Sequence, residues 1–73
     1  MDFAHEQFGA NLRRLREQAA LSQEALAHMC NLDPTTISLL ELHKRSPTLR
    51  TILSLARGLQ LSSPAELLDD IRM

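Results

Sequence analysis

The sequence predicts an all-α fold of five short helices that pack as one compact domain over residues 1–73. The chain is 44% hydrophobic but only 3% aromatic, and its apolar residues are mainly Leu and Ala, which favour helices over strands. Side chains typical of helix starts recur along the chain. A chain of this length has room for one core, so we expect modest stability or assistance from dimerisation.

The first helix is expected from roughly Ala4 to Ala19, and the second between Ser22 and Asn31. Ser22 is a typical N-cap for the second helix, because its hydroxyl can accept a hydrogen bond from a first-turn amide. Asn31 tolerates the left-handed conformation that ends a helix. The residues expected to face inward recur at helical spacing and are Phe8, Leu12, Leu15 and Ala19, then Leu26, Ala27 and Cys30.

Three further N-caps predict the remaining helices. Asp33 can cap a third helix that runs to about Leu42, and Pro34 at its first position loses no needed hydrogen bond. Thr48 can cap the fourth helix, and Ser63 opens a capping box with Glu66 for the fifth. The apolar residues expected inward are Ile37 and Leu40, then Leu49, Ile52, Leu53, Ala56 and Leu59, while the last helix carries Leu67, Leu68 and Ile71.

The composition excludes several classes of site. Cys30 is the only cysteine, which excludes an internal disulfide and a Cys-rich zinc site. His5, His28 and His43 form no metal or acid–base set with it in any recognisable spacing, so we expect no cofactor, no small-molecule ligand and no enzyme activity. No apolar run has membrane-spanning length and no basic signal region opens the chain, so we expect a soluble, cytoplasmic protein.

The formal charge of −1 argues against nucleic-acid binding, but the distribution of charge argues for it. A near-neutral total can hide one basic face. The basic residues form two groups, one in the first helix (Arg13, Arg14 and Arg16) and one after the third helix (Lys44 and Arg45). The acidic residues are concentrated near the end of the chain (Glu66, Asp69 and Asp70).

Two short helices joined by a tight turn between residues 22 and 42 have the outline of a DNA-binding helix-turn-helix. From Gln23 to Leu42 the sequence resembles the motif of Cro/cI-like repressors, also called the XRE family. The resemblance covers roughly residues 8 to 68, and the pattern is also close to restriction-modification controller proteins. It rests on a small residue at the helix crossing, a turn residue and five apolar anchors: Ala27, Asn31, Leu26, Cys30, Leu32, Ile37 and Leu40.

This resemblance implies a lambda-repressor-like fold and a sequence-specific DNA-binding regulator, in particular a repressor, whose third helix enters the major groove. It implies that Gln23 binds a phosphate. The outward positions of the third helix offer hydroxyls and methyl groups, which can meet base edges and thymine methyls. The candidate DNA-binding residues are Gln23, Thr35, Thr36, Ser38, Leu39, Lys44 and Arg45, the last two for phosphate or groove contact.

The resemblance also implies a partly buried ion pair between Arg16 and Glu41, which ties the first helix to the end of the third. One such domain contacts only a few base pairs, so we expect a homodimer on a palindromic operator of double-stranded DNA. The candidate dimer surface consists of Leu68, Ile71 and Met73, with Leu55 and Leu59 as further members.

Departures from the family pattern leave a second function open. His43 stands where the family has a Gly, so it must adopt a conformation that glycine adopts freely, and Ala20 replaces another common Gly. Leu42 cannot hold a phosphate, and together with Leu39 it forms an apolar pair on a face expected to be polar. The alternative is therefore a protein-interaction module that binds through Leu39 and Leu42 without DNA.

Overall fold

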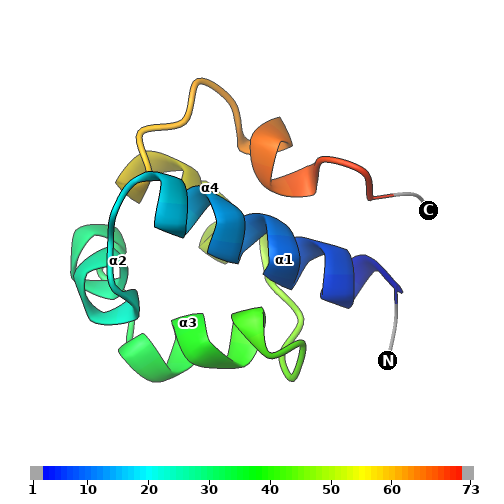
Figure 1. Cartoon of the computed structure of the whole chain (residues 1–73), viewed down its shortest axis with the longest axis horizontal. Helices are drawn as coiled ribbons and strands as arrows, with labels where there is room; N and C mark the ends of the chain where they lie inside the picture. The colour runs from blue at the N-terminus through cyan, green and yellow to red at the C-terminus, as the bar shows by residue number, and fades with distance from the viewer. Residues whose placement is uncertain (1–2, 72–73) are drawn as a thin grey trace.

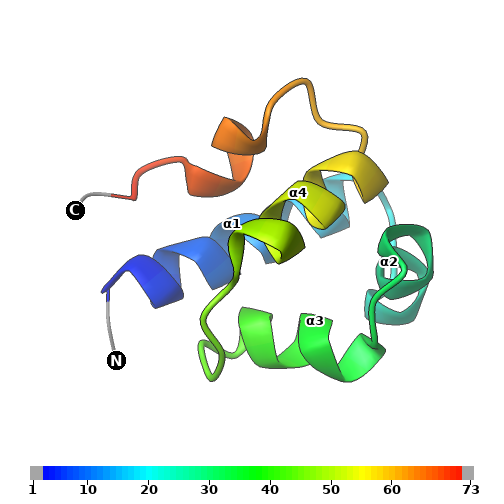
Figure 2. The same cartoon turned by 180° about the vertical axis from the view of Figure 1, so that it is seen from behind.

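The computed structural model describes residues 3–71, with side chains from residue 6 onward. Its elements are α1 (Phe3–Gln18), α2 (Gln23–Cys30), α3 (Pro34–Glu41), α4 (Leu49–Gly58) and the 3-10 helix η1 (Pro64–Leu68). α1 crosses the middle of the molecule, with α3 below it and η1 above it (Figure 1). α2 packs against α3 and α4, and α4 lies on the rear side (Figure 2), so the elements close around one core.

The N-caps lie where the sequence predicts them, because each cap side chain accepts a hydrogen bond from a first-turn amide. The caps are Ser22, Asp33, Thr48 and Ser63, and the donors are the amides of Ala25, Thr35, Thr51 and Ala65. The capping box expected between Ser63 and Glu66 is wrong in one respect, because the Glu66 side chain does not bond the Ser63 amide. The Glu66 carboxylate accepts from the amide and the hydroxyl of Ser62, each at 3.2 Å, instead of closing onto Ser63.

The buried core consists of Phe8, Leu12, Leu26, Ala27, Cys30, Ile37, Leu40, Leu55, Ala56 and Leu67. Three expectations about inward-facing residues are wrong. Ala19 lies beyond the end of α1 and is exposed, and Leu49 and Leu53 of α4 are 72% and 46% exposed. The α4 sequence also has a second apolar stripe at helical spacing, and it is this stripe that packs on the core: Ile52, Leu55, Ala56 and Leu59.

The last element is a 3-10 helix instead of the expected α-helix, and it ends at Leu68. The physical reason lies in Asn11, whose side-chain amide donates to the carbonyls of Leu67 (3.0 Å) and Asp69 (2.7 Å). Those carbonyls therefore accept hydrogen bonds from α1 instead of from the amides of a further helical turn. Ile71 consequently lies past the helix, half-buried against the core.

The last segment also revises the candidate dimer surface. Leu68 is 42% exposed, whereas Leu55 is fully buried and cannot meet a partner. Leu59 packs against the core, and Met73 lies outside the described residues. Within residues 3–71, no helix is long and apolar enough to cross a membrane.

Candidate nucleic-acid interface

The turn between α2 and α3 is built by two local features. Asn31 ends α2 in the left-handed conformation (φ 56°), and the Leu32 amide donates to the Ala27 carbonyl at 2.8 Å. Asp33 then caps α3, with Pro34 at the start of the helix. Ala27 is fully buried between the helices. This short connection holds α2 and α3 as one rigid pair with a defined crossing.

The face of α3 that points away from the core carries the predicted base-contacting residues. α3 runs along the lower border of the molecule, and its Ile37 and Leu40 are buried (Figure 1). The remaining outward positions of α3 are unburied: Thr35 is exposed, and Thr36, Ser38 and Leu39 are half-buried. This face offers hydroxyls and aliphatic surface, with no Arg, Asn or Gln among residues 34–41.

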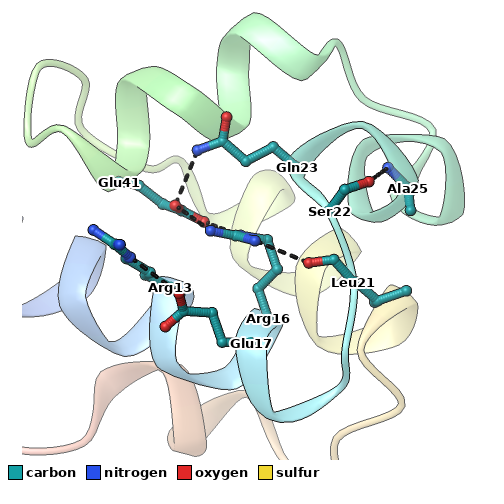
Figure 3. A network of polar contacts seen from close by, with 8 residues as sticks. All are labelled: Arg13, Arg16, Glu17, Leu21, Ser22, Gln23, Ala25 and Glu41. Carbon is teal, nitrogen blue, oxygen red and sulfur yellow. Dashed lines mark hydrogen bonds and ion pairs between the residues drawn. The ribbon is translucent and has the colours of Figure 1, made fainter.

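A polar network joins α1, α2 and α3 beside this face (Figure 3). Arg16 forms two parallel bonds with Glu41, from Nε to Oε2 (2.7 Å) and from Nη2 to Oε1 (3.1 Å), and this is the pair that the resemblance implied. Nη1 of Arg16 also donates to the Leu21 carbonyl at 2.9 Å. The side chains are only 13% and 5% exposed, and the hydrogen bond to Glu41 raises the pKa of Arg16 above its ordinary value. The positive charge of Arg16 therefore lies directly against the Glu41 carboxylate in a mostly buried place.

Gln23, the first residue of α2, is held by the same carboxylate. Its Nε2 donates to Glu41 Oε1 at 3.0 Å, which uses one of the two N–H bonds of that amide. The side chain is half-buried beside the N-terminus of α2, where free amides and the helix dipole favour an anion. The second N–H of the Gln23 amide remains available to an acceptor at this helix N-terminus.

The loop after α3 carries the two basic residues that were predicted to contact DNA. His43 adopts the left-handed conformation (φ 64°) that the sequence required, and Lys44 and Arg45 follow it as exposed residues. Nη1 of Arg45 donates to Oγ1 of Thr36 at 3.2 Å. Leu42, one half of the apolar pair, is 56% exposed at the end of α3.

Sequence reasoning missed two residues of α1 on which packing depends, and the first of them lies beside this interface. A Cβ at Gly9 would lie 2.6 Å from the Leu40 carbonyl oxygen, so glycine permits the close approach of α1 to α3. The imidazole of His43 fills the space beside Gly9, and its Nδ1 is buried without a hydrogen-bond partner among the described residues. Asn11 is the other omission. The available signals in the sequence were a glycine (Gly9) and an amide (Asn11) within an otherwise amphipathic helix.

The other two arginines of α1 bond neighbours on the same helix. Arg13 pairs with Glu17 at 3.4 Å, and Arg14 bonds the Asn11 side chain on the side of η1. Arg14 lines an open groove together with Glu66 and Asp69. These C-terminal acidic residues therefore lie beside a basic side chain and away from α3. Across the described part of the chain, no group of His, Cys, Asp or Glu could hold a metal ion.

Comparison with known proteins agrees with this geometry. The family model described as a helix-turn-helix domain matches residues 7–69. The restriction-modification controller protein C.AhdI from Aeromonas hydrophila is 40% identical, with a TM-score of 0.83 over 86% of this chain and 94% of that chain. The wild-type controller protein C.Esp1396I is 27% identical, with a TM-score of 0.85 over 90% of this chain and 87% of that chain.

A search of curated proteins gives no match. The family match covers most of the chain, and the fold is the lambda-repressor-like fold of the controller proteins. The chain therefore belongs to the helix-turn-helix domain family and is a DNA-binding transcription regulator, not an enzyme.

Proposed function

We propose that this chain is a repressor that binds a palindromic operator as a homodimer, with α3 in the major groove of double-stranded DNA. One observation carries the proposal: the Gln23 amide is held by Glu41 at the N-terminus of α2, next to the unburied face of α3. A phosphate bound there would set the register of α3 on the duplex, as phosphate contacts do in this class of motif. Such a role places the protein in the cytoplasm, with the DNA.

The net charge of −1 is compatible with this proposal. The Glu41 carboxylate would repel a phosphate, but Arg16 neutralises it through two bonds. The acids Glu66 and Asp69 lie beside Arg14 and η1, on a different side from α3. The exposed basic residues that follow α3, Lys44 and Arg45, belong to neither of the ion pairs of residues 3–71 and are therefore available to the DNA.

Base reading by α3 is expected to depend on small groups. Thr35 and Ser38 can donate or accept a hydrogen bond, and the Leu39 side chain can meet a thymine methyl. Such contacts discriminate less than bidentate ones, so we expect a mismatch at these positions to cost about 1 kcal/mol. We also expect affinity to fall steeply with salt, because each neutralised phosphate adds roughly 0.9 to the logarithmic salt slope.

The test is a mobility-shift assay at low salt, first with mixed DNA and then with sites selected from a random pool. We expect wild type to select a palindromic site, and Gln23→Ala to weaken binding by roughly tenfold on selected and scrambled DNA alike. Gln18→Ala is the matched control, because Gln18 is an exposed glutamine on α1 beside the groove of Arg14. Absence of binding by wild type would overturn the proposal, and a reporter gene under the selected site distinguishes repression from activation.

A second candidate function rests on the 56% exposure of Leu42 beside the half-buried Leu39. In this case α3 binds a protein partner through the two leucines and DNA is not involved. Leu42→Gln distinguishes the two functions. DNA binding should survive this substitution or improve, because Gln can donate to a phosphate, whereas an apolar protein interface would lose affinity.

The dimer surface that we propose lies on α4 and η1. Leu49 and Leu53 are four residues apart on one side of α4, and both are exposed. η1 packs against α4 and carries the exposed Leu68, so exposed leucines lie on two adjoining elements. Burial of these leucines against a second copy would remove three of the five exposed large apolar side chains of the described residues from water.

A further inference from the structure

The recognition face of α3 has no guanidinium of its own, but the following loop supplies one. Nη1 of Arg45 donates to the hydroxyl of Thr36, which is the third residue of α3. In a helix-turn-helix the N-terminal residues of this helix lie against base edges. Arg45 therefore reaches back from the loop to the turn of α3 that is closest to the bases.

The backbone of the loop explains this return. Leu42 closes α3, and the left-handed His43 reverses the chain in a Schellman motif. The Lys44 amide donates to the Leu39 carbonyl at 2.9 Å, and the His43 amide donates to the Leu40 carbonyl at 3.2 Å. The chain is thus folded back against the last turn of α3 before Arg45 leaves it. An extended arginine can span the remaining distance to Thr36.

The rest of the guanidinium is available to a ligand. Within residues 3–71, the ion pairs join Arg13 to Glu17 and Arg16 to Glu41, and neither involves Arg45. One N–H bonds Thr36, and the planar fork keeps four others. A fork held at a base-proximal turn matches the O6 and N7 acceptors of guanine in the major groove.

We propose that Arg45 reads a guanine in each half-site and that Thr36 is its positioning residue. This inference rests on the proposed function and deepens it, because Arg45 becomes a specificity-determining residue and not a phosphate anchor. Lysine cannot replace it, since a point charge lacks the bidentate fork. Specificity then comes from the loop, while α3 adds the weaker contacts of Thr35, Ser38 and Leu39.

The experiment measures affinities on the wild-type selected site and on a scrambled site. We expect Arg45→Lys and Arg45→Ala to lose about 10- to 100-fold on the selected site and only a few-fold on the scrambled site. Replacement of one guanine per half-site by 7-deazaguanine should cause a similar loss for wild type and no further loss for Arg45→Ala. Lys44→Ala, a basic-to-alanine control in the same exposed loop, should lose similar affinity on both sites.

Thr36→Val tests the positioning role, because it keeps the shape of the side chain and removes the hydroxyl. We expect a several-fold loss on the selected site in wild type and none in the Arg45→Ala background. An Arg45→Ala variant that loses the same affinity on both DNAs, together with an Arg45→Lys variant that binds as well as wild type, would make Arg45 a phosphate anchor. That result would overturn the inference while the proposed function stands. Failure of wild type to bind any DNA would overturn both.

Discussion

At the scale of single residues, the Arg16–Glu41 pair connects the core of the domain to its interface. Arg16 belongs to α1, Glu41 ends α3, and the same carboxylate orients Gln23 of α2. A buried pair is weak evidence of net stability, but loss of one partner leaves the other charge buried and unpaired. Glu41 thus links three helices, and in the proposed function it also orients the phosphate contact of Gln23.

Glu41→Gln should lower the free energy of unfolding by about 3 kcal/mol, because the Arg16 guanidinium would stay buried without its counter-charge. For a domain of this size that is a large fraction of the total stability. Thermal melting measures the change. Glu17→Gln is the matched control, since it makes the same substitution in the exposed pair with Arg13 and should have almost no effect. Equal melting temperatures for the two variants would contradict the role of the buried pair.

Cys30 should make stability fall at alkaline pH. Burial raises the pKa of its thiol, and a hydrogen bond involving the Gly58 backbone acts in the opposite direction. The unfolded chain therefore releases the thiol proton first, so unfolding becomes easier as the pH rises through the ordinary thiol pKa of about 8.5 and is unaffected well below it. Urea unfolding at neutral and alkaline pH, for wild type and Cys30→Ala, isolates this effect. The same pH dependence in both proteins would contradict it.

At the scale of elements, all four α-helices end in the same way. Each has a left-handed residue after its last turn, followed by the two backbone hydrogen bonds of a Schellman motif. Glycine suits this position, yet the chain uses Ala20, Asn31, His43 and Gln60, with φ between 56° and 64°. Its two glycines lie inside helices, where a Cβ would meet the Leu40 carbonyl oxygen or Cys30.

Ala20→Gly should stabilise the protein by roughly 0.5–1 kcal/mol, because alanine is strained at its φ of 58° and glycine is not. Ala20 is exposed, so little packing is lost. Chemical denaturation measures the gain. Ala19→Gly, at the neighbouring exposed residue, which has no positive φ, should instead destabilise the protein slightly. A loss of stability in both variants would show that the cap carries no strain.

Asn11 should hold the C-terminal segment on α1. Asn11→Leu leaves the carbonyls of Leu67 and Asp69 without their donor, which should cost about 2–3 kcal/mol and speed hydrogen exchange in residues 62–71. Gln7→Leu is the control, because it also replaces an amide side chain of α1 by leucine and removes only a donor to Asn11. Similar stability of the two variants would show that apolar packing alone holds the C-terminal segment on α1.

At the scale of the whole molecule, the dimensions of one copy support the dimer that we propose. The largest dimension of the Cα trace is 29 Å, whereas successive major grooves of one DNA face are about 34 Å apart. One copy presents one α3 and a few basic residues. The exposed leucines of α4 and η1 offer a means of joining two copies, with the α3 helices of both directed at DNA.

Light scattering should give a mass of about twice 8.2 kDa for wild type at high micromolar concentration. Leu53→Glu should return the mass to that of one chain and weaken binding to the palindrome, because a carboxylate cannot be buried in an apolar interface. Met29→Glu is the control, since Met29 is a comparably exposed apolar residue (48%) on α2. A wild-type mass of 8.2 kDa, unchanged with the selected DNA, would contradict dimerisation.

Local sequence determined the starts of α2, α3 and α4, the end of α2, the turn between α2 and α3, and the outward position of Thr35 on α3. Caps, left-handed residues and helical spacing act over a few residues, so they can be read without knowledge of the fold. The resemblance to Cro/cI-like proteins supplied the pairing of Arg16 with Glu41, which no local rule contains.

Only the tertiary structure decided which leucines of α4 are buried, how the last segment ends and where Arg45 lies. α4 has two overlapping apolar stripes, and the choice between Leu53 and Leu55 depends on the surfaces of α2 and η1 that pack against it. The chain after η1 is directed by Asn11, a residue 56 positions away from Leu67. These outcomes depend on contacts between distant segments, and periodicity within one helix cannot specify its partner.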